Sequence, residues 1–406
     1  MDRRLFIKSG FAALLASRFL SKAWAASQTP RAKACIILWM NGGPSHLDTF
    51  DLKPGGKFRA LSTRAPAIQI CEHLPQLADV ADHLAIIRSM TSREGNHDRA
   101  RFLMHAGYSP NPTVKHPSLG AWMSEELGAA KNDLPAFVSI SGPSAQAGFL
   151  GAQHDPFVVP NPKEPPQNTA FGRNVDADRF ARRRRALAML EARFAAETGD
   201  AKVHGRQAVY DKAVKMMFSP SLSAFDIRSE PAAVQVAYGD SDFGRGCLLA
   251  RKLVEAGVRF VEVTLDGWDT HVDNFGRTKN LMTTLDPAFA ALITELKARD
   301  LLDSTLIACM GDFGRTPKIN PNDGRDHHPQ AFSAVLAGGG IRGGLSYGAT
   351  DGEGEKVREK PVRVADLFAT LVQQLGLDPD KSFDTPLGRP ISLTDHGRPL
   401  EALLGG

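Results

Sequence analysis

Short continuous apolar runs recur along the chain, each bounded by glycine, proline or polar residues. Runs without polar alternation are typical of strands that are covered on both faces, as in a parallel sheet. They predict strands at residues 34–40, 84–87, 137–140, 258–265, 304–310 and 332–336. The last two runs frame residues 304–344, where two polar loops and a glycine cluster make this stretch the main candidate for a site.

Segments with apolar residues three or four positions apart lie between these runs and predict helices. One expected helix begins near Asp98, and the others span residues 119–127, 176–198, 208–217, 242–256, 280–299 and 364–375. Alternation of strands and helices favours right-handed crossovers between parallel strands. We therefore predict an α/β fold with a mostly parallel central sheet and helices on both faces.

The helix expected at 176–198 is the most strongly patterned one. Four of its apolar residues lie at the spacing of a core-facing stripe: Phe180, Leu187, Leu190 and Phe194. The same helix carries four consecutive arginines at 182–185. Such a run is usually a solvated face, and the alternative is an anion-binding patch.

A chain of 406 residues can form two or three domains, or one large domain with insertions. The continuous succession of strands and helices favours a single α/β domain over residues 33–395. Within it, residues 151–175 contain five prolines and little periodicity. We expect an irregular insertion or a lid there.

The N-terminal residues are typical of a targeting segment. Residues 2–8, DRRLFIK, resemble the twin-arginine export signal, and a short apolar region and a small-x-small cleavage site follow, at 10–16 and 23–25. The alternative is an amphipathic surface helix. We expect residues 1–25 to be removed after export by the twin-arginine machinery, which predicts a periplasmic or extracellular protein without a stable membrane anchor.

The charge and the cysteines limit the partners and the kinds of metal site that we expect. The whole chain carries a net charge of +4, and residues 1–25 hold five Lys/Arg and one Asp, so the remainder is formally neutral. The charge therefore gives no indication of a nucleic-acid partner. Four cysteines are present without a CxxC pair, which argues against a zinc-thiolate site. An oxidising compartment permits a disulfide, for which Cys71 and Cys247 are one pairing.

Four polar clusters each follow an apolar run. They are Asn41/His46/Asp48, Asn96/His97/Asp98, Asp266/Asp269/His271 and Asp312/Asp326/His327. Because the carboxyl ends of parallel strands meet at one edge of a sheet, we expect these side chains to converge. Neutral imidazoles and ionised carboxylates are ligands of Zn²⁺ or Mn²⁺, whereas a lone Asp or His in a loop is more often a cap or turn residue.

Six motifs together resemble the domain of unknown function 1501 family of exported sulfatase-like proteins, which has the alkaline phosphatase superfamily fold. The motifs are NGGPSHLDTFD, EGNHDRARFLMHAGY, HPSLGAW, GWDTH, GDFGRTP and GRDHHPQ, and the resemblance covers residues 33–377. It implies an alkaline phosphatase/sulfatase-like domain with a divalent metal, Zn, Mn or Ca, and a small-molecule or glycan ester as substrate.

Carried over by position, the resemblance implies five metal ligands: Asp48, Asp269, His271, Asp312 and His327. Phe313 stands where the superfamily has a histidine after the aspartate, and Asn41 stands near its first-strand aspartate, for which Asp48 substitutes. At the nucleophile position of the superfamily this chain has Asn96 and His97, and no Ser, Thr or Cys.

Further residues are expected to act on the substrate. His97 and Asn96 are assigned to catalysis, with His97 as a ligand or base, and Arg315 is assigned to hold a tetrahedral oxyanion because guanidinium binds such groups in a bidentate way. The alternative for Arg315 is a structural pair with a loop carboxylate. Five residues are expected to contact substrate: Asn41, His46, Arg99, Arg325 and His328.

The sequence thus leaves two functions open. The first is metal-dependent hydrolysis of sulfate or phosphate esters, in which a metal-activated water replaces a protein nucleophile. The second is a non-catalytic periplasmic binding or scaffold protein on a degenerate hydrolase fold, which the missing nucleophile favours. No Gly-x-Ser-x-Gly elbow or phosphate-binding glycine loop is present.

Overall fold

A computed structural model describes residues 31–128, 133–142, 144–198 and 202–405. The expected signal segment, residues 1–25, lies outside them. No helix within these residues is long and apolar enough to cross a membrane.

The central sheet has nine strands in the order β12-β4-β11-β8-β1-β7-β5-β6, with β15 paired to β4. Their bounds are β1 Ala34–Asn41, β4 Leu84–Thr91, β5 Phe137–Ile140, β6 Phe157–Val159, β7 Phe260–Asp266, β8 Thr305–Gly311, β11 Phe332–Ala337, β12 Leu345–Tyr347 and β15 Val362–Arg363. Only the two pairings of β11 are antiparallel. The prediction of a mostly parallel sheet is confirmed.

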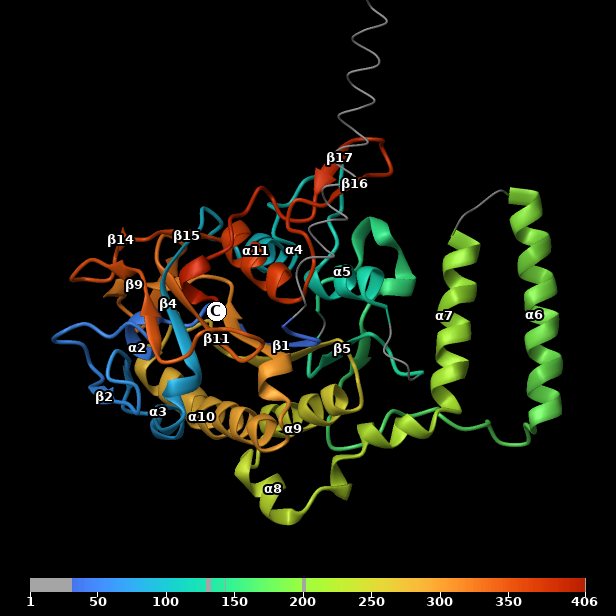
Figure 1. The fold of residues 1–406 in the computed structure, drawn as a ribbon, viewed down its shortest axis with the longest axis horizontal. Helices are drawn as coiled ribbons and strands as arrows, with labels where there is room; N and C mark the ends of the chain where they lie inside the picture. The colour runs from blue at the N-terminus through green and yellow to red at the C-terminus, as the bar shows by residue number, and fades with distance from the viewer. Residues whose placement is uncertain (1–30, 129–132, 143, 199–201, 406) are drawn as a thin grey trace, which may run out of the picture.

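Helices cover both faces of this sheet (Figure 1). On one face lie α3 Pro75–Asp79, α9 Asp242–Glu255 and α10 Asn274–Ala298, and on the other lie α4 His97–Ala106, α5 Leu119–Glu126 and α11 Val364–Gln374. The continuous apolar run of β1 explains this arrangement, because its residues alternate between two cores. Ile36 and Leu38 belong to one core, and Ile37 and Trp39 belong to the other.

Smaller elements flank the sheet. They are α2 His46–Thr49, β2 Ala60–Ser62, β3 Gln69–Cys71, α8 Ala232–Ala237, β9 Gly314–Ile319, β10 Arg325–His328, β13 Ala349–Thr350, β14 Val357–Glu359, β16 Ser382–Asp384 and β17 Pro390–Ser392. The segment 151–175, expected to be irregular, contains β6, which extends the sheet beside β5. The rest of that segment has one short 3-10 helix, Ala152–His154, and otherwise no helix or strand.

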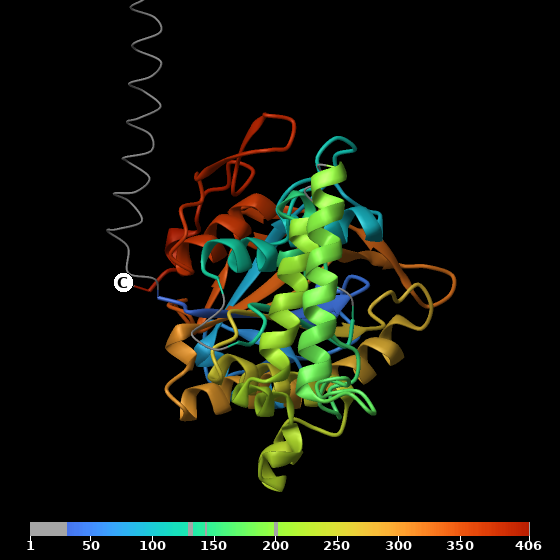
Figure 2. The ribbon, with the colours of Figure 1, turned by 90° about the vertical axis from the view of Figure 1, so that its right-hand side faces the viewer.

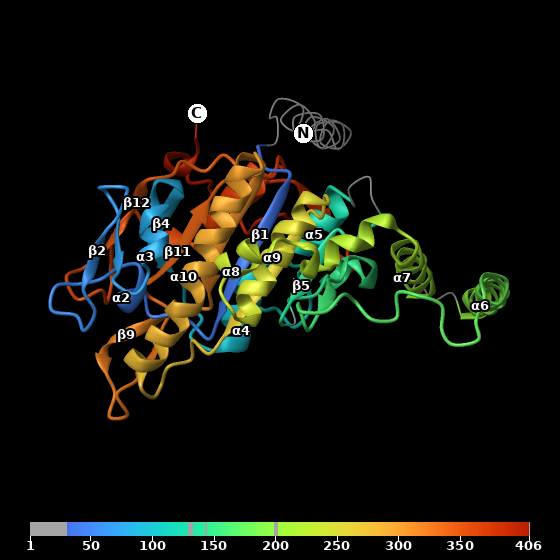
Figure 3. The same cartoon turned by 90° about the horizontal axis from the view of Figure 1, so that it is seen from below.

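Two helices extend away from the sheet, α6 Ala177–Thr198 and α7 Lys202–Met217 (Figures 1 and 3). The expectation that α6 turns its apolar stripe to the core is wrong, since Leu190 is 66% and Phe194 53% exposed. Helical spacing specifies that one face of a helix is apolar, but not which surface will cover it. Here α6 packs on α7, which covers the stripe only in part.

All four cysteines are buried and free, so the Cys71–Cys247 disulfide is not formed. Cys35 and Cys309 lie in β1 and β8 as small core residues, as the sequence predicted.

Candidate metal centre

The carboxyl ends of four parallel strands meet at one edge of the sheet. Asn41 at the end of β1 is in register with Asp266 at the end of β7, and Met40 is in register with Gly311 at the end of β8. The loop after β4 leads to α4. The antiparallel strand β11 begins at this edge, so that the loop before it, with β10, also reaches the site.

Three imidazoles surround one carboxylate oxygen here. The Nε2 atoms of His97, His271 and His327 lie 3.4, 3.3 and 3.5 Å from Asp269 Oδ1. His97, Asp269 and His327 each place a ligand atom within 4.8 Å of the others, and His271 Nε2 lies 2.9 Å from His327 Nε2. Side chains from three separate segments, the start of α4, the loop after β7 and β10, are therefore gathered around one point.

The other ring nitrogen of each histidine is held by a hydrogen-bond acceptor. His97 Nδ1 contacts Asp312 Oδ2 at 2.6 Å, His271 Nδ1 contacts Asp326 Oδ1 at 2.9 Å, and His327 Nδ1 contacts the Gly95 carbonyl at 2.8 Å. Such contacts favour hydrogen on Nδ1 and orient each ring so that Nε2 faces the common point. His97 Nε2 is buried and has no hydrogen-bond partner in the described part of the chain.

Local sequence explains how His97 is presented. Asn96 caps α4 because its side-chain oxygen accepts a hydrogen bond from the Arg99 amide, at 3.2 Å. His97 is therefore the first residue of the helix, beside the end of β8. The Phe313 ring lies 4.8 Å from the ring of His97 and 4.7 Å from that of His327, and forms an apolar wall to the site.

Arg315 is buried and positions Asp269. Its Nε donates to the Gly43 carbonyl at 2.9 Å, Nη1 donates to the Arg325 carbonyl at 3.1 Å, and Nη2 donates to Gly42 and, at 2.6 Å, to Asp269 Oδ1. Burial raises the pKa of Asp269, but the hydrogen bond and charge of Arg315 outweigh it and lower the pKa to about 2. Asp269 is therefore ionised at neutral pH.

The environment moves the imidazole pKa values in opposite directions. The hydrogen bond to Asp312 raises the pKa of His97, whereas burial lowers the pKa of His327. His327 is therefore neutral at pH 7 and has a lone pair to offer, and the Asp312 carboxylate makes the ring of His97 a more basic donor.

This donor set fits a divalent transition metal. Imidazole nitrogens with one carboxylate are the ligands that Zn²⁺ uses, and the same set suits Mn²⁺. A cation would give the buried Nε2 of His97 the partner that it lacks, and it would balance the negative charge of Asp269. His97, His271, His327 and Asp269 are the residues that could hold it, with Asp312, Asp326 and Arg315 in supporting contacts.

The structure places two residues expected at the site in a separate buried network. Arg325 Nε donates to Asp48 Oδ2 at 2.8 Å. Ser45 and Asn274 donate to the same oxygen at 2.6 and 2.9 Å. Because the Asp48 carboxylate and the Arg325 guanidinium already satisfy each other, we leave them out of the ligand set and the substrate contacts.

Other expected contacts with substrate are likewise engaged elsewhere. His46 Nε2 contacts the Gly354 carbonyl at 2.8 Å and His328 Nε2 contacts the Glu355 carbonyl at 2.6 Å, so that both hold the loop after β13. Arg99 forms a bidentate pair with Glu94, at 2.7 Å for each bond. Asn41 donates to Asp266 Oδ1 at 2.6 Å.

Arg315 follows the alternative given for it, because four of its N–H groups are bound within the protein and its side chain is fully buried. Asp312 contacts a histidine and does not lie in the group of possible ligands. Sequence reasoning placed Asp326 in one of the four polar clusters without a role of its own, and it gave no role to Gly95; these two residues hold His271 and His327. Asp326 is adjacent to His327 in the chain, but the Gly95 carbonyl carries no sequence signal.

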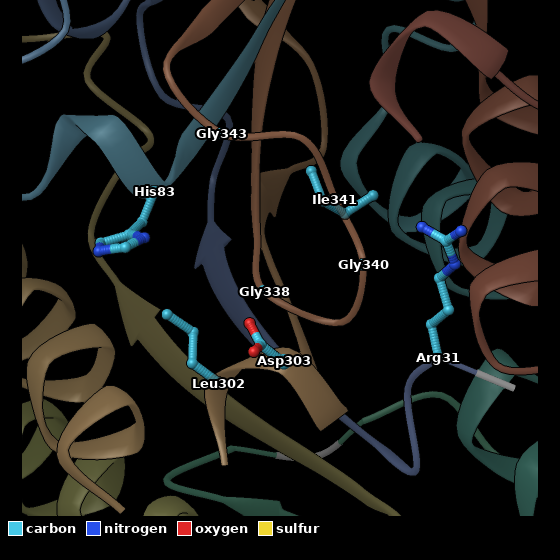
Figure 4. A pocket seen from close by; sticks show the side chains of 8 residues that line it. All are labelled: Arg31, His83, Leu302, Asp303, Gly338, Gly340, Ile341 and Gly343. Atoms are coloured by element: carbon cyan, nitrogen blue, oxygen red, sulfur yellow. The ribbon is translucent and has the colours of Figure 1, made fainter. Parts of the chain in front are cut away.

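A pocket of about 310 Å³ lies at the opposite edge of the sheet (Figure 4). It is lined by Arg31, His83, Leu302, Asp303, Gly338, Gly340, Ile341 and Gly343. His83 precedes β4 and Asp303 precedes β8, so the pocket is at the amino ends of the strands. It is unrelated to the histidine cluster.

Comparison with known proteins identifies the family. The family described as Protein of unknown function (DUF1501) matches residues 32–404, and the chain belongs to it. No curated protein matches the chain.

Three solved structures illustrate what the chain is similar to. The first is a phosphonate monoester hydrolase from Silicibacter pomeroyi, with 12% identity, a TM-score of 0.40, and coverage of 92% of this chain and 76% of that one. The PsFucS1 sulfatase from Pseudoalteromonas sp. has 14% identity, a TM-score of 0.38, and coverage of 88% and 70%. A protein in the alkaline phosphatase superfamily from Vibrio parahaemolyticus has 13% identity, a TM-score of 0.40, and coverage of 92% and 70%. These are proteins of the class that the sequence predicted, and at such TM-scores they carry no argument about what this chain acts on.

Proposed function

We propose that this chain is an exported, metal-dependent hydrolase of sulfate or phosphate esters. The observation that carries the proposal is the convergence of three Nε2 atoms on Asp269 Oδ1, with each Nδ1 held by an acceptor. A divalent ion bound there would polarise an ester oxygen and activate a water molecule for attack. This chemistry needs no Ser, Thr or Cys at the start of α4.

The surrounding residues would then have distinct tasks. Arg315 fixes the carboxylate of Asp269, and Asp312 fixes the ring of His97. The Phe313 ring excludes water from one side of the two imidazoles it contacts. None of these residues is free to hold the anionic part of a substrate, so we assign that task to no residue of the described chain.

One observation favours a second candidate function, metal-dependent binding without catalysis. The start of α4 carries Asn96 and His97 instead of a hydroxyl or thiol nucleophile. A degenerate hydrolase would keep the ligands and lose that group. The two candidates share the metal and differ only in turnover.

The first test is the metal content of the purified protein, measured by plasma mass spectrometry. We expect near-stoichiometric Zn or Mn in the wild type and a strong loss in His327→Ala. His83→Ala is the matched control, because His83 lies at the opposite end of β4. A metal-free wild type that is folded and unaffected by chelator would overturn both candidates. If metal is present, 4-nitrophenyl sulfate and 4-nitrophenyl phosphate separate them, since only the hydrolase releases 4-nitrophenol.

A further inference from the structure

The two-helix hairpin of α6 and α7, with the residues that flank it, carries most of the exposed large apolar side chains of the described chain. Seven of the eleven large hydrophobic residues that are exposed in the described chain lie between residues 171 and 218. Four of them form what we term the hairpin patch: Leu190, Phe194, Val209 and Tyr210. Large apolar groups concentrated on one surface mark an interaction site, whereas scattered ones do not.

Ion pairs between the helices fix how α6 and α7 lie against each other. Arg184 pairs with Asp211 at 2.6 Å and Arg206 pairs with Glu191 at 3.5 Å, so the helices run antiparallel in a defined register. Glu191 follows Leu190 in the chain, and the Arg206 guanidinium lies 5.9 Å from the ring centre of Tyr210. Leu190 of α6 and Tyr210 of α7 therefore both lie next to the Arg206–Glu191 pair.

The hairpin is strongly basic. Residues 177–197 and 205–217 contain nine Lys/Arg and four Asp/Glu, an excess of five, whereas the whole chain has a net charge of only +4. Arg182, Arg183 and Arg185 are exposed and form no ion pair with the described residues. The overall charge of the protein conceals this local excess.

The shape of the hairpin matters for its partner. It stands away from the sheet at one end of the molecule, and from the side its two helices lie in front of the body (Figures 1 and 2). It is a projecting surface, suited to a flat partner, and nothing in the fold obstructs its approach. An apolar stripe with flanking arginines is the pattern of helices that lie in a lipid interface.

We infer that the hairpin patch docks on an anionic lipid surface. Leu190, Phe194, Val209 and Tyr210 would enter the boundary between headgroups and acyl chains, and the arginines would lie among anionic headgroups. A second copy of the chain fits less well, because it would bring two basic surfaces together. This inference is independent of the metal centre.

The test is cosedimentation of the full chain with two kinds of vesicle. One contains phosphatidylglycerol and phosphatidylcholine in equal parts, and the other contains phosphatidylcholine alone. We expect binding only to the anionic vesicles, and weaker binding at high salt. The R182Q/R183Q/R185Q variant, which leaves the Arg184–Asp211 pair intact, should bind about 100-fold more weakly. L190E/F194E should lose at least about tenfold.

Matched controls are Val236→Glu and Leu387→Glu, since these residues are 77% and 70% exposed but lie outside the hairpin. Both should bind like the wild type. All variants keep the N-terminal segment, so any contribution of that segment to vesicle binding is the same in each. Circular dichroism confirms that each variant is folded. The inference fails if the wild type ignores anionic vesicles, or if the controls lose as much as L190E/F194E. It also fails if the patch instead drives a concentration-dependent dimer, seen by sedimentation, that L190E/F194E abolishes.

Discussion

The contact between Asp312 and His97 shows how a buried carboxylate can position a candidate metal ligand without itself lying among the ligands. Asp312 is 1% exposed, and its Oδ2 lies 2.6 Å from His97 Nδ1. We predict that Asp312→Asn, which can still accept this hydrogen bond but lacks the charge, weakens metal binding by about 10- to 100-fold. Competition with a chelator measures it. Asp351→Asn is the control, since Asp351 accepts hydrogen bonds from loop amides, and equal affinities in both variants would contradict the assignment.

A second buried histidine predicts a dependence of stability on pH. His105 Nε2 lies 3.2 Å from Glu262 Oε1 beneath the sheet edge. Burial lowers the pKa of His105, but the attraction of Glu262 outweighs it, so the folded-state pKa is raised above the ordinary value of a histidine. The stabilisation is therefore complete below about pH 6.5 and is lost as the pH rises through the folded-state pKa.

The expected result is that His105→Gln lowers the free energy of unfolding by roughly 3 kcal/mol in acid, and by less as the pH rises. Urea unfolding between about pH 5 and pH 9 measures it. Glu262→Gln should remove the same pH dependence, because the pair needs both charges. A difference from wild type that stays constant across this range would rule out the ion pair as its cause.

Between elements, a tight backbone approach holds Asp269 in the candidate metal centre. Gly42, just after β1, has a φ of +111°, and a Cβ there would overlap the backbone nitrogen of Asp269. We predict that Gly42→Ala displaces Asp269, costs about 2 kcal/mol of stability or more, and weakens metal binding. Gly55→Ala is the matched control, because its φ is +80° but no atom lies within 4 Å of the added Cβ. Gly55→Ala should lose stability but keep its metal affinity. Full metal affinity in Gly42→Ala would contradict the prediction, because Asp269 would then bind the metal even when it is displaced from Gly42.

At this scale the sequence predicted the main strands and the helices α6 and α7, but not that the apolar stripe of α6 is exposed. The strands were predictable because uninterrupted apolar runs have few other uses, and strand ends then placed His97, His271 and His327 at one edge. The sequence could not predict that Asp269 lies among the possible ligands while Asp312 instead holds the ring of His97. This difference depends on small shifts between the segments that carry the two residues. The exposure of the apolar stripe of α6 was not predictable either, because helical spacing does not indicate which surface will cover the stripe.

Across the whole molecule, the candidate metal centre joins segments that are far apart in the chain. Its four candidate ligands follow β4 and β7 and precede β11, and the supporting residues Asp312, Arg315 and Asp326 lie between β8 and β11. The hairpin of α6 and α7 leaves the sheet at the opposite end of the long axis from β2 and β9 (Figure 1). The proposed lipid docking and the proposed metal binding would therefore use separate parts of one fold, and a variant that removes one should leave the other intact.

Because the ligands come from several loops, metal binding should stabilise the entire fold. A ligand that binds only the folded state at about 100 times its Kd adds roughly 2.7 kcal/mol, which for a chain of this size corresponds to a rise in Tm of roughly 3–5 °C. We predict this rise on adding Zn²⁺ or Mn²⁺ to chelator-treated wild type, followed by calorimetry. His327→Ala should show no rise, and His83→Ala should respond like the wild type. An equal rise in His327→Ala would mean that the ion binds elsewhere on the protein, and the histidine cluster would then be a structural network.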